Sequence, residues 1–485
     1  MKRAMSKERY LKSFVSFSVG TWANALLSFI TTPVVTFLIS PKEFGKASIY
    51  TLVYSILLIV VRLGTEQSYV RFFYEFSETD RKKLLWNCMW PGLWLLAMIS
   101  IVLMFFSRNI SKLIVGECDS KIILLLIFSL FTGLLQIYNM YSIRMKQMGW
   151  RYSFIQVLFN LFNFAGVLSF SLIFARNFYS IVVGQIVANI GAFAIGVAFE
   201  TDYWKPVKWQ MDILKKVVLY GIPFVPTSLL LWVFQSIDRL TLRAMTSFDE
   251  VGLYTAAFKV VSAMNLIQAG FTTFWVPVSY EQFQKDPDDK HLYKKMNEII
   301  SVLMFLFASV VVLGKDVIFL IVSRNYRPSA YIAPFLVLGP VMYSISETTV
   351  LGINFMKKTY WHFVISVFTS TTNVLGNILL VPLLGAKGAA ISTGLSYVLF
   401  FTLRTKISTK LYPVDYELGK IYASTVLLVF QCYFATMNRN LLLNVVVGLL
   451  TVCGIGLVYR KVLLRESKEA IVMLKRFVNE RRRGV

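Results

Sequence analysis

The segment LLWNCMWPGLWLLAMISIVLMFF, residues 84–106, runs for 23 residues without a charged side chain. A bilayer core about 30 Å thick is crossed by roughly 20 apolar residues in a helix, so this segment is long enough to span a membrane. Hydrocarbon cannot hydrate free backbone groups and no alternating barrel pattern is present, so the segment must be helical. Similar runs recur along nearly the whole chain, which is 56% hydrophobic. We therefore predict an all-α polytopic membrane protein.

About fourteen transmembrane helices are expected when the uncharged runs are divided at charged or Pro/Gly-rich breaks. These candidate spans are 14–39, 47–66, 84–106, 122–142, 153–175, 178–199, 217–237, 251–275, 298–322, 330–356, 360–382, 388–403, 419–436 and 441–459. With the N-terminus in the cytoplasm, the inside segments hold 34 of the 50 Lys and Arg residues, the outside loops hold 12 and four lie within spans. Because Lys and Arg are enriched on the cytoplasmic side, this alternation supports the count and predicts that both termini are cytoplasmic.

The composition argues against several classes of function. The formal charge of +24 comes from short loops and the two termini, which is typical of membrane topology and not of nucleic-acid binding. The four cysteines have no CxxC spacing and the two histidines have no HExxH context, so neither a disulfide framework nor a metal site is expected. No cofactor is expected. The first apolar segment is too long for a signal-peptide core and should stay as the first helix.

An internal repeat appears when the chain is compared with itself. At an offset near 207, the stretch SPKEFG at 40–45 matches SFDEVG at 247–252, and at an offset of 210 the pairs Asn163/Asn373, Gly166/Gly376 and Gly184/Gly394 agree. An even number of spans separates the paired positions, so the two halves should share orientation and be related by an axis along the membrane normal. We expect two pseudo-symmetric six-helix bundles facing a central cavity, with an additional C-terminal helix pair.

This repeat divides the chain into six parts. They are a cytoplasmic N-terminal segment (1–13), an N-terminal bundle (14–199), a cytoplasmic linker (200–216), a C-terminal bundle (217–404), an additional helix pair (405–460) and a basic cytoplasmic tail (461–485). The tail could form an amphipathic helix on the anionic inner leaflet, and the alternative is a solvated tail whose basic residues enforce topology.

Short motifs in both halves carry a resemblance to a known family. They are SVGT (18–21), TP (32–33), SPKEFG (40–45), LGTEQS (63–68), YGIP (220–223), SIDR (236–239) and VGLY (251–254). On these motifs the chain resembles the bacterial oligosaccharide (Wzx-type) flippases of the polysaccharide-transporter family, in the multidrug/oligosaccharidyl-lipid/polysaccharide exporter superfamily. The resemblance covers essentially the full chain. It implies a protein of the bacterial cytoplasmic membrane that flips undecaprenyl-diphosphate-linked repeat units for capsule, O-antigen or exopolysaccharide, with H⁺ or Na⁺ counter-transport and a polysaccharide polymerase as a partner.

Charged residues inside the expected spans suggest where an anionic cargo could bind, because each costs about 2.5–3.5 kcal/mol near the bilayer centre and should face a cavity or a partner. Arg62 and Glu66 can pair at i, i+4, with Arg71 beyond them. Arginine forks bind diphosphate oxygens well. The candidate substrate-binding residues are Arg62, Glu66, Arg71, Asp238, Arg239, Arg243 and Lys259. The alternatives are a structural ion pair at Arg62, topology-setting residues at the end of span 7 and a snorkelling side chain at Lys259.

Glu347 is a carboxylate in the tenth expected span, with no basic neighbour nearby in the sequence. A lone membrane carboxylate can carry a proton whose loss is coupled to transport, because desolvation favours its neutral form. We therefore consider an ion-coupling role for Glu347. A partnered structural residue and an interfacial position are the alternatives.

Besides a structural or scaffolding membrane protein, three other functions are alternatives to the flippase. An enzyme such as a polymerase or ligase would place catalytic groups in a large external loop, but these loops are short and neither a GxxxxGK[ST] nor a GxSxG motif occurs. A cation-coupled multidrug exporter of the same superfamily would favour acidic cavity residues over Arg62, Arg239 and Lys259. A lipid II flippase is the third alternative.

Overall fold

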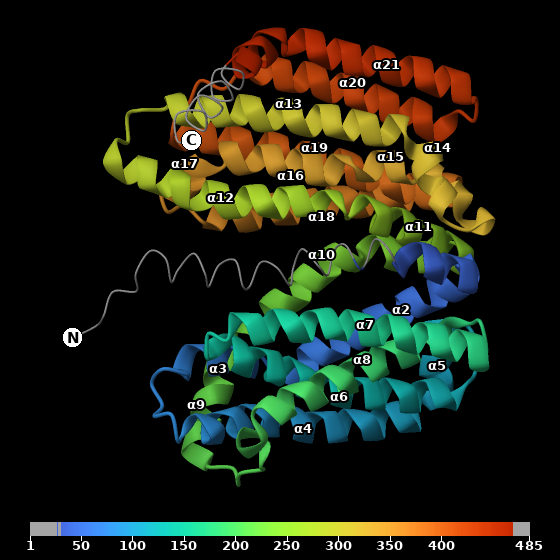
Figure 1. The fold of residues 1–485 in the computed structure, drawn as a ribbon, viewed down its shortest axis with the longest axis vertical. Coiled ribbons are helices and arrows are strands. Elements are labelled where there is room, and N and C mark those ends of the chain that lie inside the picture. Colours follow the sequence, from blue (N-terminus) through green and yellow to red (C-terminus); the bar gives the residue numbers. More distant parts are fainter. Residues whose placement is uncertain (1–26, 28–30, 469–485) are drawn as a thin grey trace, which may run out of the picture. The chain divides into compact units, whose positions relative to one another are not determined.

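The computed structural model describes residues 27 and 31–468, and it divides into two compact units, 1–255 and 256–485 (Figure 1). Most of the first expected span, 14–39, and the tail beyond residue 468 lie outside the described residues. Within the described residues the regular structure is entirely helical, which confirms the all-α prediction.

Unit 1 contains the helices of the first half of the chain. They are α2 (Pro41–Arg62), α3 (Thr65–Phe72), α4 (Arg81–Phe105), α5 (Ser107–Val115), α6 (Ser120–Met145), α7 (Gly149–Ile173), α8 (Phe178–Phe199), η1 (Thr201–Trp204), α9 (Met211–Gly221) and α10 (Phe224–Met245). The next helix, α11 (Phe248–Val261), begins in unit 1 and ends in unit 2.

Unit 2 contains the remaining elements. They are α12 (Met264–Lys285), α13 (His291–Leu313), α14 (Lys315–Ile318), η2 (Phe319–Ile321), η3 (Arg324–Tyr331), α15 (Ala333–Leu336), α16 (Leu338–Thr349), α17 (Leu351–Phe355), α18 (Tyr360–Leu384), α19 (Ala386–Leu411), α20 (Leu418–Met437) and α21 (Leu441–Val458). The last two form the expected C-terminal helix pair.

Ten described helices are long and apolar enough to cross a membrane, and the number rises to twelve if each of two bent helix pairs is one span. The bent pairs are α9 with α10, and η3 with the helices that follow it. The expected span 251–275 is divided between α11 and α12, and the span 14–39 is mostly not described. The prediction of about fourteen spans agrees with this count within those two differences.

Helix positions repeat along the chain as the sequence comparison predicts. The helices that begin at Pro41, Arg81, Gly149 and Phe178 are followed 207 to 211 residues later by those that begin at Phe248, His291, Tyr360 and Ala386. The two compact units meet at residue 255, whereas the repeat predicts bundles that end at residue 199 and begin at residue 217. The bundle boundaries therefore stay a prediction.

The start of α2 shows how local sequence fixes a helix end. Ser40 is the N-cap, its side chain accepts a hydrogen bond from the backbone N–H of Glu43, and Pro41 follows at the first helical position. These are the residue types that favour a helix start. Lys46, although buried, pairs with Glu43 at 3.0 Å and Glu117 at 2.7 Å. The sequence can therefore place a lysine in this span because two carboxylates compensate its charge.

The two glycines matched by the repeat, Gly45 and Gly252, lie against each other within unit 1. A Cβ on Gly45 would lie 1.9 Å from the backbone oxygen of Phe248, and one on Gly252 would lie 1.9 Å from that of Pro41. One turn further along, Thr255 Oγ1 donates to Ser48 Oγ at 3.0 Å, and these two residues are also equivalent at the 207-residue offset. The shared motif therefore encodes a close backbone contact between α2 and α11.

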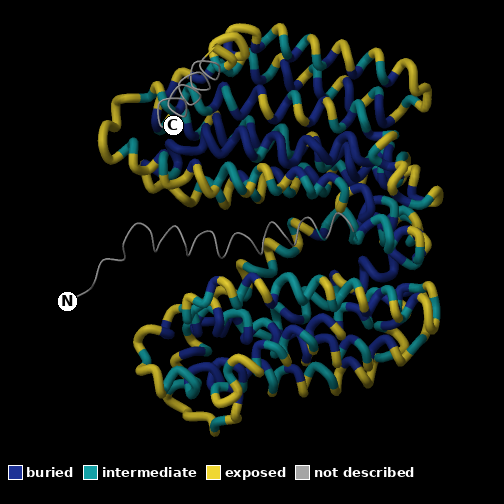
Figure 2. Tube along the Cα trace, in the orientation of Figure 1, coloured by how far each residue is buried: buried dark blue, intermediate teal, exposed yellow. Residues whose placement is uncertain are grey.

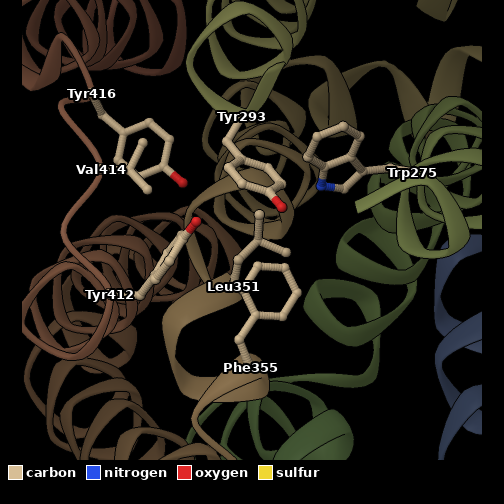
Figure 3. Close-up of a cluster of buried hydrophobic side chains, with 7 residues drawn as sticks. All are labelled: Trp275, Tyr293, Leu351, Phe355, Tyr412, Val414 and Tyr416. Atoms are coloured by element: carbon tan, nitrogen blue, oxygen red, sulfur yellow. The ribbon is translucent and has the colours of Figure 1, made fainter. Parts of the chain in front are cut away.

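Helix α16 of unit 2 is almost completely enclosed, since every residue except Tyr343 is buried (Figure 2). It packs on α13, α19 and α12. A cluster of buried aromatic and aliphatic side chains lies beside its C-terminal end (Figure 3), and its members are Trp275, Tyr293, Leu351, Phe355, Tyr412, Val414 and Tyr416. This cluster fixes the segment that leads from α19 to α20, because Tyr416 Oη donates to the backbone oxygen of Thr348 at 2.8 Å.

Candidate functional site

A sharp break in the second span positions Arg62 and Glu66. Helix α2 ends at Arg62, Leu63 and Gly64 both have left-handed backbones with φ of 53° and 69°, and α3 begins at Thr65. Gly64 is required here for two reasons, since a Cβ would lie 2.2 Å from the backbone oxygen of Gly221 and a positive φ favours glycine. The break turns a single expected span into two helices.

Arg62 and Glu66 pair across this break. Arg62 Nη1 lies 3.7 Å from Glu66 Oε1, and Arg62 Nε donates to the backbone oxygen of Leu58 at 3.2 Å. The Arg62 side chain is 20% exposed and that of Glu66 is 7% exposed. The predicted pairing is confirmed, but the ion pair is loose, and Glu66 Oε2 is buried without a hydrogen-bond partner among the described residues. A guanidinium held this loosely can exchange its carboxylate for another anion.

The residues around the break are held by a buried hydrogen-bond network. Thr65 Oγ1 shares hydrogen bonds with Tyr138 Oη at 2.6 Å and with the backbone oxygen of Cys88 at 2.8 Å. Ser68 Oγ donates to the backbone oxygen of Val217 at 2.6 Å. Side chains from α3 are thereby tied to α4, α6 and α9. This network fixes the start of α3 and with it the carboxylate of Glu66 beside Arg62.

Arg71 lies in a different setting. Its Nη1 pairs with Glu75 Oε1 at 2.7 Å, and Lys216 Nζ pairs with Glu75 Oε2 at 3.0 Å. All three side chains are more than 40% exposed. Because Lys216 donates a hydrogen bond to it, the pKa of Glu75 is lowered. The structure therefore places Arg71 in a surface ion-pair network that connects α3 with α9, apart from the Arg62–Glu66 pair.

The candidates near the end of α10 are fixed by aromatic neighbours. Asp238 accepts a hydrogen bond from Tyr254 Oη at 2.6 Å, which connects α10 with α11. Arg243 lies over the ring of Phe248, 4.1 Å from its centroid, and its buried Nε has no hydrogen-bond partner within the part of the chain that the structure describes. Cation–π contact replaces a carboxylate as the partner of Arg243.

Arg62 and Arg239 are not brought together. The helices α2 and α10 run antiparallel and are connected midway by a 2.8 Å hydrogen bond from Trp232 Nε1 to Ser55 Oγ. Arg62 and Arg239 each lie seven residues from this bond in opposite directions, so a helix rise of about 1.5 Å per residue separates them by roughly 20 Å. Arg239 Nη2 donates to the backbone oxygen of Gln235 at 3.3 Å. The arginines of unit 1 therefore occupy two levels and do not form one cluster.

Lys259 is an exposed residue in the last turn of α11. This helix ends at Val261, and α12 begins three residues later. Lys259 thus lies close to a helix end, and not within a continuous span as the expected segment 251–275 implies.

Glu347 has a basic partner in the structure, although none lies near it in the sequence. Arg404 Nη1 lies 2.9 Å from Glu347 Oε1 and also donates to Ser346 Oγ at 2.7 Å. Both side chains are at least 90% buried. The sequence around Glu347 does not reveal this partner, because Arg404 lies 57 positions further along the sequence, on α19. The partnered alternative describes this geometry.

Arg404 is the residue that sequence reasoning missed. The expected span 388–403 ends one residue before it, whereas α19 continues to Leu411. The polar residues after Arg404 point into the unit, because Thr405 bonds Thr349 at 2.7 Å and Ser408 Oγ accepts from the backbone N–H of Gly352 at 2.8 Å. A threonine–serine pattern at helical spacing after Arg404 was the available signal for a longer helix.

The guanidinium group of Arg404 is buried beside two aromatic rings. The guanidinium carbon lies 5.5 Å from the ring centroid of Tyr343 and 5.3 Å from that of Phe400. Its Nε is buried and has no hydrogen-bond partner in residues 27 and 31–468. No group of three or more His, Cys, Asp or Glu side chains able to hold a metal ion occurs among the described residues.

A match to a known sequence family identifies the family of this chain. A family model described as polysaccharide biosynthesis protein matches residues 10–283, more than half of the chain. The chain belongs to this family. The recognition of a polysaccharide-transporter protein is therefore confirmed. No curated protein sequence matches the chain.

Solved structures share the fold of this polysaccharide biosynthesis protein. The lipid II flippase MurJ, in an inward closed conformation, matches with a TM-score of 0.68 at 15% identity, over 93% of this chain and 100% of MurJ. A multidrug resistance MATE family transporter of the MOP superfamily, in an inward-facing conformation, matches with a TM-score of 0.55 at 14% identity, over 82% and 97%. A point mutant of the MATE transporter VcmN of Vibrio cholerae gives 0.52 at 15%, over 82% and 95%. The chain is thus a multi-pass membrane protein with the fold of these transporters.

Proposed function

We propose that the protein is a flippase that moves undecaprenyl-diphosphate-linked oligosaccharide repeat units from the inner to the outer leaflet of the bacterial cytoplasmic membrane. The product would be used for capsule, O-antigen or exopolysaccharide assembly, with a polysaccharide polymerase as the next protein to act. In this proposal both termini lie in the cytoplasm. The protein is a transporter in this proposal and carries out no bond-forming chemistry.

The single observation that carries the proposal is Arg62 in this family context. The chain belongs to a polysaccharide biosynthesis family and carries, at the end of a membrane-spanning helix, a partly exposed guanidinium with only a loose ion pair. Arginine donates paired hydrogen bonds to phosphate oxygens in a geometry that lysine cannot reproduce. A diphosphate could displace the weak contact with Glu66 and be held while the sugar crosses.

The mechanism we propose is alternating access with a cationic central cavity. The diphosphate is held by basic residues, the sugar crosses through a hydrated path and the polyprenyl chain stays in lipid. Arg239, Arg243 and Lys259 are proposed as further contacts, together with Glu66, Arg71 and Asp238. Because Arg62 and Arg239 lie at two levels of unit 1, the diphosphate would meet them one after the other. Counter-transport of H⁺ or Na⁺ would drive the cycle.

The experiment is a reconstitution in liposomes that contain an undecaprenyl-diphosphate oligosaccharide in the inner leaflet. Flipping makes the sugar accessible to an external glycosidase, and protein-dependent cleavage is the expected result. Arg62→Gln should slow cleavage by about 10-fold or more, because a hydrogen bond to a charged group contributes about 1.5–3 kcal/mol. The matched control is Arg108→Gln, which removes an exposed arginine from α5 and should leave the rate unchanged. An unchanged rate with Arg62→Gln would contradict the cationic cavity.

A second candidate is a lipid II flippase, favoured by the similarity to MurJ over the whole of that chain. It is distinguished by supplying lipid II in the same liposomes. Cleavage of the oligosaccharide lipid without transfer of lipid II supports the first proposal, and the reverse supports the second. Drug-stimulated ion flux without movement of either lipid would indicate the third candidate, a cation-coupled multidrug exporter.

A further inference from the structure

A basic hollow lies between the start of α20 and the end of α21 in unit 2. Its volume is about 400 Å³, and its lining includes Lys420, Arg460 and Lys461 together with Glu417. The predicted topology places these helix ends at the cytoplasmic surface of the membrane. The hollow is far along the chain from the residues of the proposed cavity, and its charge is the same whichever substrate is transported.

The charges of the hollow are unbalanced. Lys420 contacts the carboxylate of Glu417. Arg460 and Lys461 are exposed and form no ion pair with any residue of the described ranges. Three positive charges therefore face one negative charge, and a net charge of two remains for an anion. Because Arg460 and Lys461 both line the hollow, their side chains can contact the same phosphate group.

Both walls of the hollow are held in place. The chain reaches α20 through Tyr416, which belongs to the buried cluster beside α16 (Figure 3), and Leu418 N–H donates to the backbone oxygen of Tyr416 at 2.8 Å. On the other wall, Tyr459 and Val462 are buried on either side of the two basic residues. Arg465 then pairs with the buried Glu298 of α13 at 2.9 Å. A ligand would thus find the basic groups already placed, with little ordering required.

An apolar surface adjoins the charged one. Leu457 lines the hollow and is 68% exposed, and Leu450, two turns earlier on the same face of α21, is 66% exposed. A phosphate group alone would leave these side chains unused. A molecule that carries both a phosphate and a hydrocarbon chain matches the whole surface, and basic pockets between helices on the cytoplasmic side suit anionic headgroups.

We propose that this hollow binds the headgroup phosphate of an anionic phospholipid of the inner leaflet, with an acyl chain along Leu457 and Leu450. Lys420, Arg460 and Lys461 would contact the phosphate oxygens. Such a lipid would bridge α20 and α21 at their cytoplasmic ends, so it would stabilise the C-terminal helix pair.

The test is native mass spectrometry of the purified full chain, titrated in detergent with phosphatidylglycerol or phosphatidylcholine. Phosphatidylglycerol should bind the wild type more tightly than phosphatidylcholine. The double variant Arg460→Gln/Lys461→Gln should weaken phosphatidylglycerol binding about 25-fold, since each basic side chain contributes about fivefold in affinity. The matched control is Lys406→Gln/Lys410→Gln, which removes two exposed lysines of α19 on the same predicted side.

An additional variant and a competing ligand distinguish the possible outcomes. The charge-conserving variant Arg460→Lys/Lys461→Arg should bind like the wild type, which shows that loss of binding in the neutral variant does not come from misfolding. Inorganic phosphate at the same concentration should not displace the lipid, and displacement would overturn the lipid assignment in favour of a simple phosphate site. Equal binding of the two lipids, or equal loss in the Lys406/Lys410 control, would overturn the site.

Discussion

Arg404 is held by an ion pair, by a hydroxyl and by two aromatic rings, all inside unit 2. Burying the pair is costly in itself, because both ions lose their hydration. The larger cost appears when one partner is removed, since the other charge then stays buried alone. Glu347 and Arg404 should therefore behave as one unit in any mutational test.

We expect Arg404→Met to lower the free energy of unfolding by about 3–5 kcal/mol, because Glu347 is left as an unpaired buried carboxylate. The double variant Arg404→Met/Glu347→Met should regain most of this loss, since neither charge remains. Thermal unfolding of the purified protein in detergent measures both. A double variant as unstable as the single one would show that packing, and not charge compensation, is the role of Arg404.

The double variant Arg404→Met/Glu347→Met also distinguishes a structural role of Glu347 from a role in ion coupling. If Glu347 carries a coupling proton, flipping by the folded double variant should lose its dependence on pH. If the pair is structural, the pH dependence should match that of the wild type. The liposome assay performed over a range of pH values decides between them, and this comparison is not confounded by instability of the single variants.

The residue-scale predictions from sequence succeeded where partners are local. Arg62 and Glu66 lie four residues apart, so helical geometry alone indicated their pairing, although the backbone between them is not helical. Glu347 and Arg404 lie on different helices, and no pattern along one helix can reveal such a partner. Hydropathy also predicted that the span beginning at residue 388 ends at residue 403. An arginine is assigned to a loop when its buried partner is unknown.

At the scale of the elements, the contact between α2 and α11 depends on two residues without side chains. Gly45→Val would place a side chain 1.9 Å from a backbone oxygen, so the helices must separate. We expect this change to lower the melting temperature measurably and to increase cysteine reactivity at an introduced Ser48→Cys. The control is Gly456→Ala in α21, where an added Cβ meets nothing within 4 Å. It should be neutral or slightly stabilising, because alanine favours helix over glycine.

The ion pairs between α3 and α9 should respond to acid. The pKa of Glu75 is lowered from its ordinary value of 4.5, chiefly by the hydrogen bond from Lys216. A lowered folded-state pKa stabilises the fold above the ordinary value, and the contribution is lost as pH falls below it. The melting temperature of the wild type should therefore exceed that of Glu75→Gln slightly at pH 7, and the difference should shrink as the pH falls below 4.5 and through the lowered folded-state pKa. A difference that stays constant as the pH is lowered would contradict this account.

Helix positions could be predicted better than helix breaks. The lengths of the uncharged runs located the spans, because every helix that crosses the hydrocarbon core needs about the same number of apolar residues. The break between α9 and α10 falls at Pro223, which interrupts helical hydrogen bonding and can be read from the sequence. The break at Gly64 could not be read in the same way, since its cause lies in a close approach of two segments 157 residues apart. Gly64 and Gly221 each meet the backbone of the other, and only the folded chain shows that contact.

At the scale of the whole molecule, the predicted topology can be tested with a natural cysteine. Cys118 is exposed in the loop between α5 and α6, which is expected outside, whereas Cys88 and Cys432 are buried and Cys453 lies within the apolar helix α21. A membrane-impermeant maleimide applied to intact cells with a permeable outer barrier should label Cys118, and Cys118→Ser should abolish the signal. Labelling of Cys118 only after membrane disruption would invert the topology.

The contact of Gly45 with Gly252 and of Ser48 with Thr255 has a consequence for biosynthesis. Its two sides are about 207 residues apart, so α2 enters the membrane long before α11 exists. At about 5–20 residues per second, the ribosome needs tens of seconds to supply the missing half of this contact. During that interval the small-residue surface of α2 faces lipid or the insertion machinery. A nascent chain arrested before residue 245 should therefore be more easily degraded than one arrested after residue 261, although both contain the first six spans.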